Sequence, residues 1–291
     1  MPRIAVIGNS GGWSSERLAD CVADVTGRRL LVDMENICLD LFRGKVWYDG
    51  TDLTQLDAII IKKIGSYYSP CLLDRLEILR FLESRGVRIF SRPLHIMRVL
   101  DRLSCTTTLR MAGIPMPPTA VTESADQAVK VIEDFKDVIL KPLYSSKARG
   151  MRMVSYGPDT RIDVENFRRE NPIMYIQKKI NLNGRDLGIV FLGGRYLTTY
   201  ARCNQTGSWN TTTESGGRYA PFDPAPETIE IAGKAQALFD LDFTCVDVAE
   251  TPDGVYVFEV SAFGGFKGMK TACSMDGAKC YVDYVLKRIT E

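Results

Sequence analysis

The sequence predicts a mixed α/β (α+β) protein in which an open, mostly parallel sheet comes first and an antiparallel sheet comes last. Short apolar runs alternate with helical patterns over residues 1–91, which is typical of a parallel sheet with crossover helices. Near the C-terminus, two apolar segments flank Pro252-Asp253-Gly254, which indicates an antiparallel hairpin. Arg92-Pro93 marks a break between the two parts, because a proline restricts the residue before it.

Strands and helices alternate along the N-terminal part. Strands are expected at 4–7, 30–32, 58–61 and 87–90, with a loose hairpin around Gly44 over 37–48. The first strand leads into the glycine-rich turn 8–12, and Ser14 or Ser15 is the expected cap of the helix that follows. A second helix is expected at 72–83. This order predicts an N-terminal α/β domain over residues 1–91.

The rest of the chain predicts two further units. Helices are expected at 94–100 and 104–112, and the proline-rich segment 113–118 follows as a rigid linker. A small α/β unit then has helices at 125–135 and 164–169 and strands at 138–141, 151–156 and 174–177. The last block has strands at 187–191, 196–201, 244–249 and 255–260, a helix at 227–239 and helices after Gly268. We expect a second domain over 92–291, with a central subdomain at about 119–178 and a C-terminal antiparallel-sheet subdomain at about 179–291 that includes the helices of 92–118.

Composition excludes several classes of protein. The chain has 291 residues, 45% of them hydrophobic and 25% charged, with a net charge of +1, so no basic field steers it to nucleic acid or to an acidic membrane. It has no apolar run of roughly 20 residues and no signal-peptide pattern at its start. Eight cysteines without a C-x-x-C pair and one histidine argue against zinc, iron–sulfur or Ser-His-Asp chemistry. We expect a cytoplasmic protein with no nucleic-acid or membrane partner.

The C-terminal hairpin carries a pair of acidic residues. With the turn centred on Asp253, Asp247 and Glu259 fall almost opposite each other, and Ser261 shares their face. Two facing carboxylates repel unless a cation or proton lies between them. Mg²⁺ commonly takes one or two carboxylates together with phosphate oxygens. A solvated sheet face with two unrelated acids fits the hairpin equally well.

A basic loop follows a buried strand in the central unit. Lys141-Pro142 ends the strand, and Ser145-Ser146-Lys147-Ala148-Arg149-Gly150 follows. Backbone N–H groups and cations in such a loop can bind a polyphosphate, with Ser146 and Arg149 as candidate ligands. Taken alone, the loop also fits an exposed cationic surface.

An acid and an arginine lie at the ends of two further strands. Gly184-Arg185-Asp186 directly precedes the strand expected at 187–191, and Arg202 lies at the end of the next strand. An arginine near the hairpin acids can stabilise the negative charge of a moving phosphoryl group. A surface ion pair is the alternative.

In their order and spacing, these elements resemble the ATP-grasp superfamily, and within it ligases of the RimK-like (ribosomal-protein-glutamate-ligase) type. The resemblance covers about residues 90 to 270. It rests on Arg92-Pro93, Asp101-Arg102-Leu103, Gly113-Ile114-Pro115, Lys141-Pro142, Gln177-Lys178-Lys179-Ile180, Gly184-Arg185-Asp186, Arg202, Gly216-Gly217, Asp247 and Glu259-Val260-Ser261.

The resemblance implies an ATP-grasp fold with ATP and Mg²⁺, for which Mn²⁺ can substitute, between the central lid subdomain and the C-terminal subdomain. It implies a ligase in which a carboxylate attacks the γ-phosphate of ATP and an amine then displaces phosphate from the acyl-phosphate. The implied nucleotide ligands are Arg102 and Lys141 at the phosphates, Gln177, Lys178, Lys179 and Ile180 at the adenine, and Asp186 near the ribose. The implied metal ligands are Asp247, Glu259 and Ser261, and Arg202 is the implied catalytic residue.

Four positions depart from the family pattern. Ser261 stands where relatives have a metal-binding asparagine, and Arg102 stands where they have a phosphate-binding lysine. Gly188 and Thr212 replace an arginine and an asparagine that contact the amino-acid substrate in relatives. Glutamate is therefore not carried over as a substrate. The expected partners are a small-molecule or peptide carboxylate and an amine or amino acid, and a homo-oligomer is plausible for the family.

Two loops are candidate acceptor sites. One contains Asn9, Ser10 and Gly11 at the end of the first strand, and the other contains Gly265 within 262–268. Both also fit tight turns that bind nothing. The first loop raises an alternative function, an NAD(P)-binding Rossmann-type oxidoreductase, although its glycine spacing is not G-x-G-x-x-G. A non-catalytic nucleotide-binding relative is the other alternative, which Ser261 favours.

Overall fold

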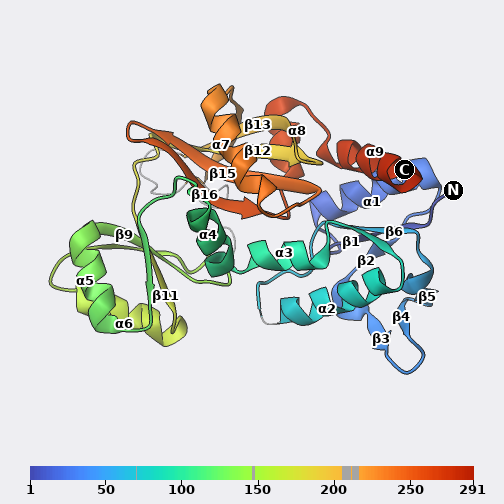
Figure 1. The fold of residues 1–291 in the computed structure, drawn as a ribbon, viewed down its shortest axis with the longest axis horizontal. Helices are drawn as coiled ribbons and strands as arrows, with labels where there is room; N and C mark the ends of the chain where they lie inside the picture. The colour runs from blue at the N-terminus through green and yellow to red at the C-terminus, as the bar shows by residue number, and fades with distance from the viewer. Residues whose placement is uncertain (70, 146–147, 205–210, 212–215) are drawn as a thin grey trace.

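Figure 1 shows the computed structural model, in which the structure describes residues 1–291 except 70, 146–147, 205–210 and 212–215. The described residues form four sheets. Two of them are a parallel sheet near the N-terminus and a five-stranded antiparallel sheet near the C-terminus. The predicted combination of a parallel and an antiparallel sheet is therefore confirmed.

The N-terminal sheet has the strand order β2-β1-β6-β7 and is parallel throughout. Its strands are β1 (Ile4–Ile7), β2 (Leu31–Val32), β6 (Ala58–Ile61) and β7 (Arg88–Phe90). All residues of β1 and β6 are buried, as expected for parallel strands covered on both faces. The flanking helices are α1 (Trp13–Thr26) and α2 (Cys71–Ser84). A small antiparallel sheet of β3 (Cys38–Asp40), β4 (Lys45–Tyr48) and β5 (Thr51–Asp52) follows β2, with 3₁₀ turns at Met34–Asn36 and Leu53–Gln55.

The predicted cap of α1 is wrong. The helix begins at Trp13, its N-cap is Gly12, and no side chain caps it. The hydroxyl of Ser15 instead accepts a hydrogen bond from the Asn9 N–H at 3.2 Å. Ser15 therefore stabilises the turn before α1 and does not cap the helix.

The central unit is built on the antiparallel sheet β10-β9-β11-β8. Its elements are β8 (Thr119–Thr122), α5 (Ala125–Phe135), β9 (Asp137–Lys141), β10 (Arg152–Ser155), α6 (Thr160–Glu170) and β11 (Met174–Lys178). Strand β8 was not predicted from the sequence, because the prolines before it indicate a linker and its residues are only half-buried. This unit has its own apolar core, and it lies at one end of the molecule in Figure 1.

The C-terminal sheet has the order β14-β13-β12-β15-β16. Its strands are β12 (Arg185–Leu192), β13 (Arg195–Cys203), β14 (Arg218–Pro221), β15 (Phe243–Thr251) and β16 (Gly254–Ser261). The helices α7 (Pro226–Ala237), α8 (Phe266–Cys273) and α9 (Gly277–Thr290) accompany it, and α3 (Pro93–Leu100) and α4 (Arg102–Met111) pack against β16. Strand β14 was not predicted from the sequence, and α8 begins at Phe266 rather than after Gly268 as expected.

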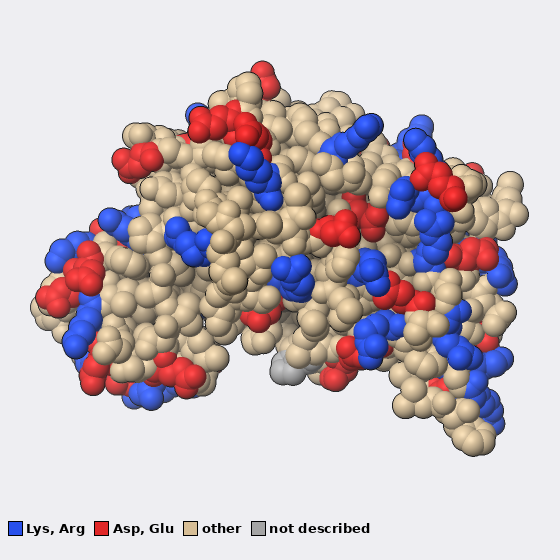
Figure 2. Space-filling view, in the orientation of Figure 1, with Lys and Arg blue, Asp and Glu red and all other residues tan. Residues whose placement is uncertain are grey.

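A shared apolar core joins the N-terminal sheet to the C-terminal sheet. It includes Ile4 and Leu18 from the first part and Phe243, Phe266 and Tyr281 from the last. The rings of Phe243 and Phe266 meet edge to face at 5.1 Å between centroids. Lys and Arg alternate with Asp and Glu over the face shown in Figure 2, which agrees with the small net charge. No helix in the described parts of the chain is long and apolar enough to cross a membrane.

Candidate active site

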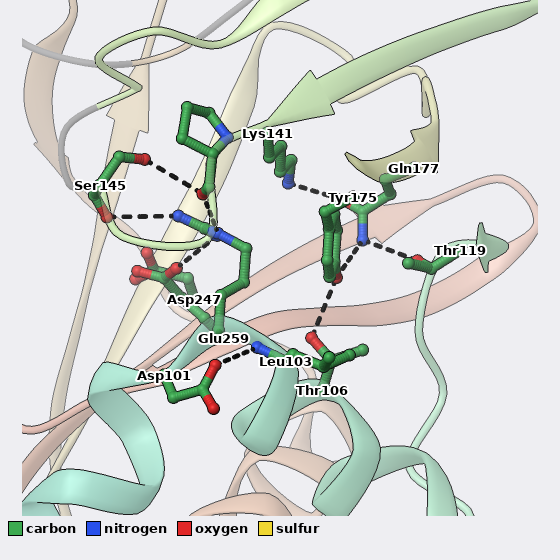
Figure 3. A network of polar contacts seen from close by, with 12 residues as sticks. Asp101, Leu103, Thr106, Thr119, Lys141, Ser145, Tyr175, Gln177, Asp247 and Glu259 are labelled. Atoms are coloured by element: carbon green, nitrogen blue, oxygen red, sulfur yellow. Dashed lines mark hydrogen bonds and ion pairs between the residues drawn. The ribbon is translucent and has the colours of Figure 1, made fainter. Parts of the chain in front are cut away.

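The acidic pair lies on the β15–β16 hairpin, where the spacing of the turn predicts it. Asp247 pairs directly with Glu259, and Cys245 pairs with Ser261. A bulge follows Asp247 and bends the strand there. The Asp247 side chain is 19% exposed and that of Glu259 is 43% exposed, so Glu259 reaches further into the cleft. Figure 3 shows the two side chains beside each other.

Arg202 on β13 lies between two carboxylates. Its Nε donates to Asp186 at 3.1 Å, a second contact joins its Nη2 to Asp186, and Nη2 lies 3.1 Å from an oxygen of Asp247. Burial lowers the pKa of Arg202, but Asp186 and Asp247 outweigh burial and raise that pKa well above its ordinary value. The cross-strand pairs Asp186–Arg202 and Gly188–Asp247 put these charges on one face of the sheet, since side chains alternate along strands.

Asp247 is held in an environment that penalises its charge. Burial raises the pKa of Asp247, Arg202 opposes that rise, and Glu259 adds to it. A divalent cation between Asp247 and Glu259 would relieve both the burial and the repulsion. The residues therefore fit a cation that takes two carboxylates together with phosphate oxygens. In the described ranges, no three His, Cys, Asp or Glu side chains are grouped so that they could hold a metal ion by themselves.

Arg102 links three elements around this cleft. Its Nη1 donates to Glu259 at 3.2 Å, its Nε donates to the Pro142 carbonyl at 3.1 Å, and its Nη2 donates to the Ser145 carbonyl at 3.3 Å. Asp101 caps α4 by accepting from the Leu103 N–H, which fixes the start of the helix that carries Arg102. Arg102 thus ties the loop after β9 to the acidic hairpin.

Lys141 at the end of β9 is a buried cation without a carboxylate partner among the described residues. Its Nζ donates to the Gln177 side-chain oxygen at 2.6 Å, and Figure 3 shows the two groups pointing at each other. Burial, and then the charge of Arg102, lowers the pKa of Lys141 to about 7. An anionic ligand in the cleft would favour the charged form. The Tyr175 hydroxyl accepts from the Gln177 amide at 3.4 Å. Tyr175 was not among the predicted site residues, although its two-residue spacing from Gln177 on β11 puts both on one face.

The remaining nucleotide candidates lie at several places. Gln177 is buried in β11, and the N–H groups of Lys178 and Lys179 already donate to the carbonyls of Pro118 and Asp137, each at 2.8 Å. Their N–H groups are therefore engaged within the protein, and Ile180 follows the strand, half-buried. Other candidates are Arg149, whose guanidinium lies 5.6 Å from the ring of Tyr67 in the N-terminal part, and Ser146, which lies outside the described residues.

The predicted acceptor loops both lie near the start of a helix. The Asn9 amide donates to Ser66 at 3.2 Å, the Gly11 N–H donates to Glu16 at 2.7 Å, and Ser10 is exposed. Gly265 is the N-cap of α8 and is half-buried. Thr212 lies outside the described residues. The loop after β6 also reaches the cleft, because Tyr68 lines the same cavity as Arg102, Glu259 and Ser261, and no motif in the sequence indicated this.

Comparisons with known proteins agree with this geometry. The family model described as "RimK-like ATP-grasp domain" matches residues 99–285. The tetrahydromethanopterin:alpha-L-glutamate ligase of Methanosarcina acetivorans is 26% identical over 261 residues, which cover 80% of this chain and 81% of that protein. The beta-citrylglutamate synthase B of Homo sapiens is 23% identical over 274 residues, which cover 91% of this chain and 70% of that protein.

Solved structures share the fold along the whole chain. The ATP-grasp ligase PsnB, complexed with a phosphomimetic variant of its minimal precursor, Mg and ADP, has a TM-score of 0.76 at 17% identity and covers 98% of both chains. D-alanyl-alanine synthetase A from Vibrio cholerae has a TM-score of 0.74 at 14% identity and covers 100% of both chains. The predicted ATP-grasp fold is confirmed. Neither the NAD(P)-dependent oxidoreductase nor the non-catalytic relative finds support in these comparisons.

Proposed function

The chain belongs to the RimK-like ATP-grasp family, and from this premise we propose how its cleft carries out the ATP-dependent ligation of a carboxylate to an amine. The enzyme uses ATP with Mg²⁺, and the proposal concerns the residues that bind them. The observation that carries it is the direct pairing of Asp247 with Glu259 on the hairpin, with Arg102 and Arg202 on either side.

Asp247 and Glu259 are the proposed metal ligands, and Ser261 is a third oxygen donor. Mg²⁺ bound there, or Mn²⁺ in its place, would supply charge neutralisation at the phosphate oxygens. Arg102 is bonded to Glu259 and to the loop carbonyls, and in the nucleotide complex we expect it to turn its donors to phosphate. Lys141 is the second proposed phosphate ligand. A bound phosphate would favour the protonated form of the Lys141 amine, which burial disfavours.

Arg202 is the proposed catalytic residue. Its pairs with Asp186 and Asp247 fix the guanidinium beside the metal ligands, so its position does not depend on the substrate. We propose that the substrate carboxylate attacks the γ-phosphate and displaces ADP. An amine then attacks the acyl-phosphate, loses a proton and displaces inorganic phosphate. Arg202 stabilises the negative charge in both steps, and the rest of the catalytic effect is positioning.

Only the chemical class of the proposed substrates is carried over from the relatives. Six relatives, among them the one from Methanosarcina acetivorans, are named as alpha-L-glutamate ligases. We propose an amino acid as the amine partner and a small-molecule or peptide carboxylate as the group that is activated. We also propose that the functional units are a domain over 1–91 and an ATP-grasp domain over 92–291, with the central unit of about 119–178 as the lid.

Thermal melting with ligands tests the nucleotide site. A ligand that binds only the folded state at a hundredfold excess over its Kd adds about 2.7 kcal/mol of stability. We expect Mg²⁺–ATP and Mg²⁺–ADP to raise the melting temperature and Glu259→Ala to remove most of that rise. Without ligand, Glu259→Ala should change stability by only about 0–1 kcal/mol, because the Glu259 side chain is 43% exposed.

The matched control is Glu230→Ala, which removes an exposed glutamate on α7 that pairs with Lys234. It should leave the ligand-induced rise unchanged. Release of phosphate should then be screened with a panel of carboxylates and amines. A melting shift with NAD(H) and none with either adenine nucleotide would contradict the proposed site.

A further inference from the structure

Lys62 lies at the carboxyl end of β6, one residue after the strand, and its side chain is buried. Residue Lys62 is 2% exposed, and its Nζ donates to the carbonyls of Phe263, at 3.5 Å, and Gly264. The same Nζ lies 3.8 Å from the centre of the Phe266 ring. Burial, and then the charge of Lys63, lowers the pKa of Lys62 well below its ordinary value. Among the described contacts of Lys62 there is no carboxylate, so carbonyl oxygens and an aromatic ring, rather than an opposite charge, contact its amine.

The carbonyls that Lys62 binds belong to the segment that follows the proposed metal ligands. The Phe263 N–H donates to the Ser261 hydroxyl oxygen at 3.3 Å, and the Thr244 hydroxyl donates to the Ser261 carbonyl at 2.8 Å. A chain of contacts therefore runs from Lys62 to the Phe263 carbonyl, along the backbone of Phe263 to its N–H, and from there to the Ser261 hydroxyl. Since Ser261 is two residues after Glu259 on β16, this chain ends at the proposed metal site.

The segment is pressed against the C-terminal sheet. A Cβ placed on Gly264 would lie 2.9 Å from a ring carbon of Phe243 and 3.0 Å from the Cβ of Cys245. Gly264 therefore allows a close approach that a side chain would prevent. Contact with the sheet limits the segment on one side, and Lys62 holds its carbonyls from the N-terminal domain on the other.

We propose that Lys62 is a positioning residue for the metal end of the ligase active site. By binding the Phe263 and Gly264 carbonyls, it keeps the Phe263 N–H on Ser261 and thereby directs the Ser261 hydroxyl toward the cleft. The inference rests on the proposed function, because Ser261 and Glu259 are metal ligands only within it. It explains why a buried amine is kept where an apolar side chain would avoid the cost of desolvation.

Lys62→Met tests the proposal, since methionine keeps the apolar stem and removes the donor. Residues that orient metal ligands typically contribute 10–100-fold to metal affinity, so we expect the Mg²⁺ concentration for half-maximal ADP binding to rise about 10-fold or more. In the protein without metal or nucleotide, the Phe263 amide should exchange its hydrogen faster than in the wild type. The melting temperature should stay near that of the wild type, because loss of a buried amine and loss of two carbonyl partners oppose each other.

A double-mutant cycle with Ser261→Ala separates positioning from a general structural role. If Lys62 acts through Ser261, adding Lys62→Met to Ser261→Ala should weaken Mg²⁺ binding little further. Lys62→Gln keeps an N–H donor on a shorter stem and should give an intermediate effect, and it replaces Lys62→Met in the cycle if that variant does not fold. Ile59→Val, a buried change on β6, the strand that Lys62 follows, should lower the melting temperature without changing the Mg²⁺ requirement.

Two results would overturn the inference. One is an unchanged Mg²⁺ requirement in folded Lys62 variants, and the other is independent effects of the Lys62 and Ser261 substitutions. If the proposed function itself were wrong, the wild-type protein would show no Mg²⁺-dependent binding of ADP, which distinguishes that case from an incorrect role for Lys62.

Discussion

Two buried cations lie near the acidic hairpin on two different sheets. Burial lowers the pKa of both, but the net shifts of the two pKa values are opposite. Arg202, on the C-terminal sheet, lies between Asp186 and Asp247, and its pKa is raised. Lys141, on the central sheet, is bonded to the neutral side chain of Gln177, and its pKa is lowered to about 7. The hydrogen-bond partner therefore decides the direction of the net pKa shift. A carboxylate favours the charged form of a buried cation, whereas an amide compensates less of the cost of desolvation.

The difference suggests different roles for the two cations. Arg202 is a fixed charge that the fold needs, because its two partners are themselves largely buried. Lys141 is a charge that the protein alone supports poorly and that an anionic ligand would complete. On this view, the C-terminal sheet provides a cation, Arg202, that stays charged with or without ligand. The central unit provides Lys141, whose charged form is favoured when the nucleotide binds.

The largest expected loss of stability comes from removing Arg202. Arg202→Met leaves Asp186 and Asp247 without their partner, and breaking a buried ion pair in this way typically costs about 3–5 kcal/mol of unfolding free energy. Urea unfolding at pH 7 measures the loss. Ligase activity should also fall by about 10²–10³-fold in the protein that remains folded, as for other groups that stabilise a developing negative charge.

A control for this loss is Arg17→Met, which breaks the ion pair between α1 and Asp276. Those side chains are 33% and 29% exposed, so the expected cost is about 0.2–1 kcal/mol. Equal losses in the two variants would show that Arg202 does not hold the acidic cluster together.

The acidic hairpin could be predicted from sequence because a turn signal fixes the pairing of its strands. The Pro252-Asp253-Gly254 turn and the two-residue period together place Asp247 opposite Glu259. The buried strands β1 and β6 could be predicted for a similar reason, since their apolar runs end at turns. These are local patterns, and a single sequence contains them.

Contacts between distant segments could not be predicted in the same way. The bond between Lys62 and the Phe263 and Gly264 carbonyls joins β6 to the segment after β16, and no spacing in the sequence brings them together. Gly188 is another case. Its Cβ would lie 2.5 Å from the Tyr200 ring, so packing across strands, rather than a turn, accounts for the glycine. The missed strands β8 and β14 are short and half-exposed, and they acquire their structure from neighbouring strands.

The titration of Lys141 gives a second effect, which develops gradually with pH. The pKa of Lys141 is about 7 in the folded protein, whereas an unfolded lysine has a pKa of about 10.4. Between these pH values the unfolded chain binds more protons, so the unfolding free energy rises with pH, by up to about 1.4 kcal/mol per pH unit from this group. Below about pH 7 both states are protonated and the rise disappears.

Other groups titrate over this range, so the measurement is a difference. The unfolding free energy of Lys141→Met, measured from pH 6 to 10, should be subtracted from that of the wild type. The difference should increase with pH above about 7. Parallel curves would mean that Lys141 keeps an ordinary pKa in the fold.

The smallest expected effect on stability comes from giving Lys141 the kind of partner that Arg202 has. Gln177→Glu places a carboxylate 2.6 Å from the Lys141 Nζ, and Tyr175 can turn its hydroxyl to donate to it. Thr119 can donate to the carboxylate only by giving up its bond to the Pro117 carbonyl. The attraction offsets the burial of a second charge, so stability at pH 7 should change by about 1 kcal/mol or less. The pKa of Lys141 should return toward its ordinary value, and the pH-dependent difference described for Lys141 should move to higher pH. Mg²⁺–ADP should also bind more weakly, because the carboxylate competes with phosphate for the same amine. If the Gln177→Glu protein instead lost several kcal/mol and bound ADP as before, the contrast between the two cations would not come from their partners.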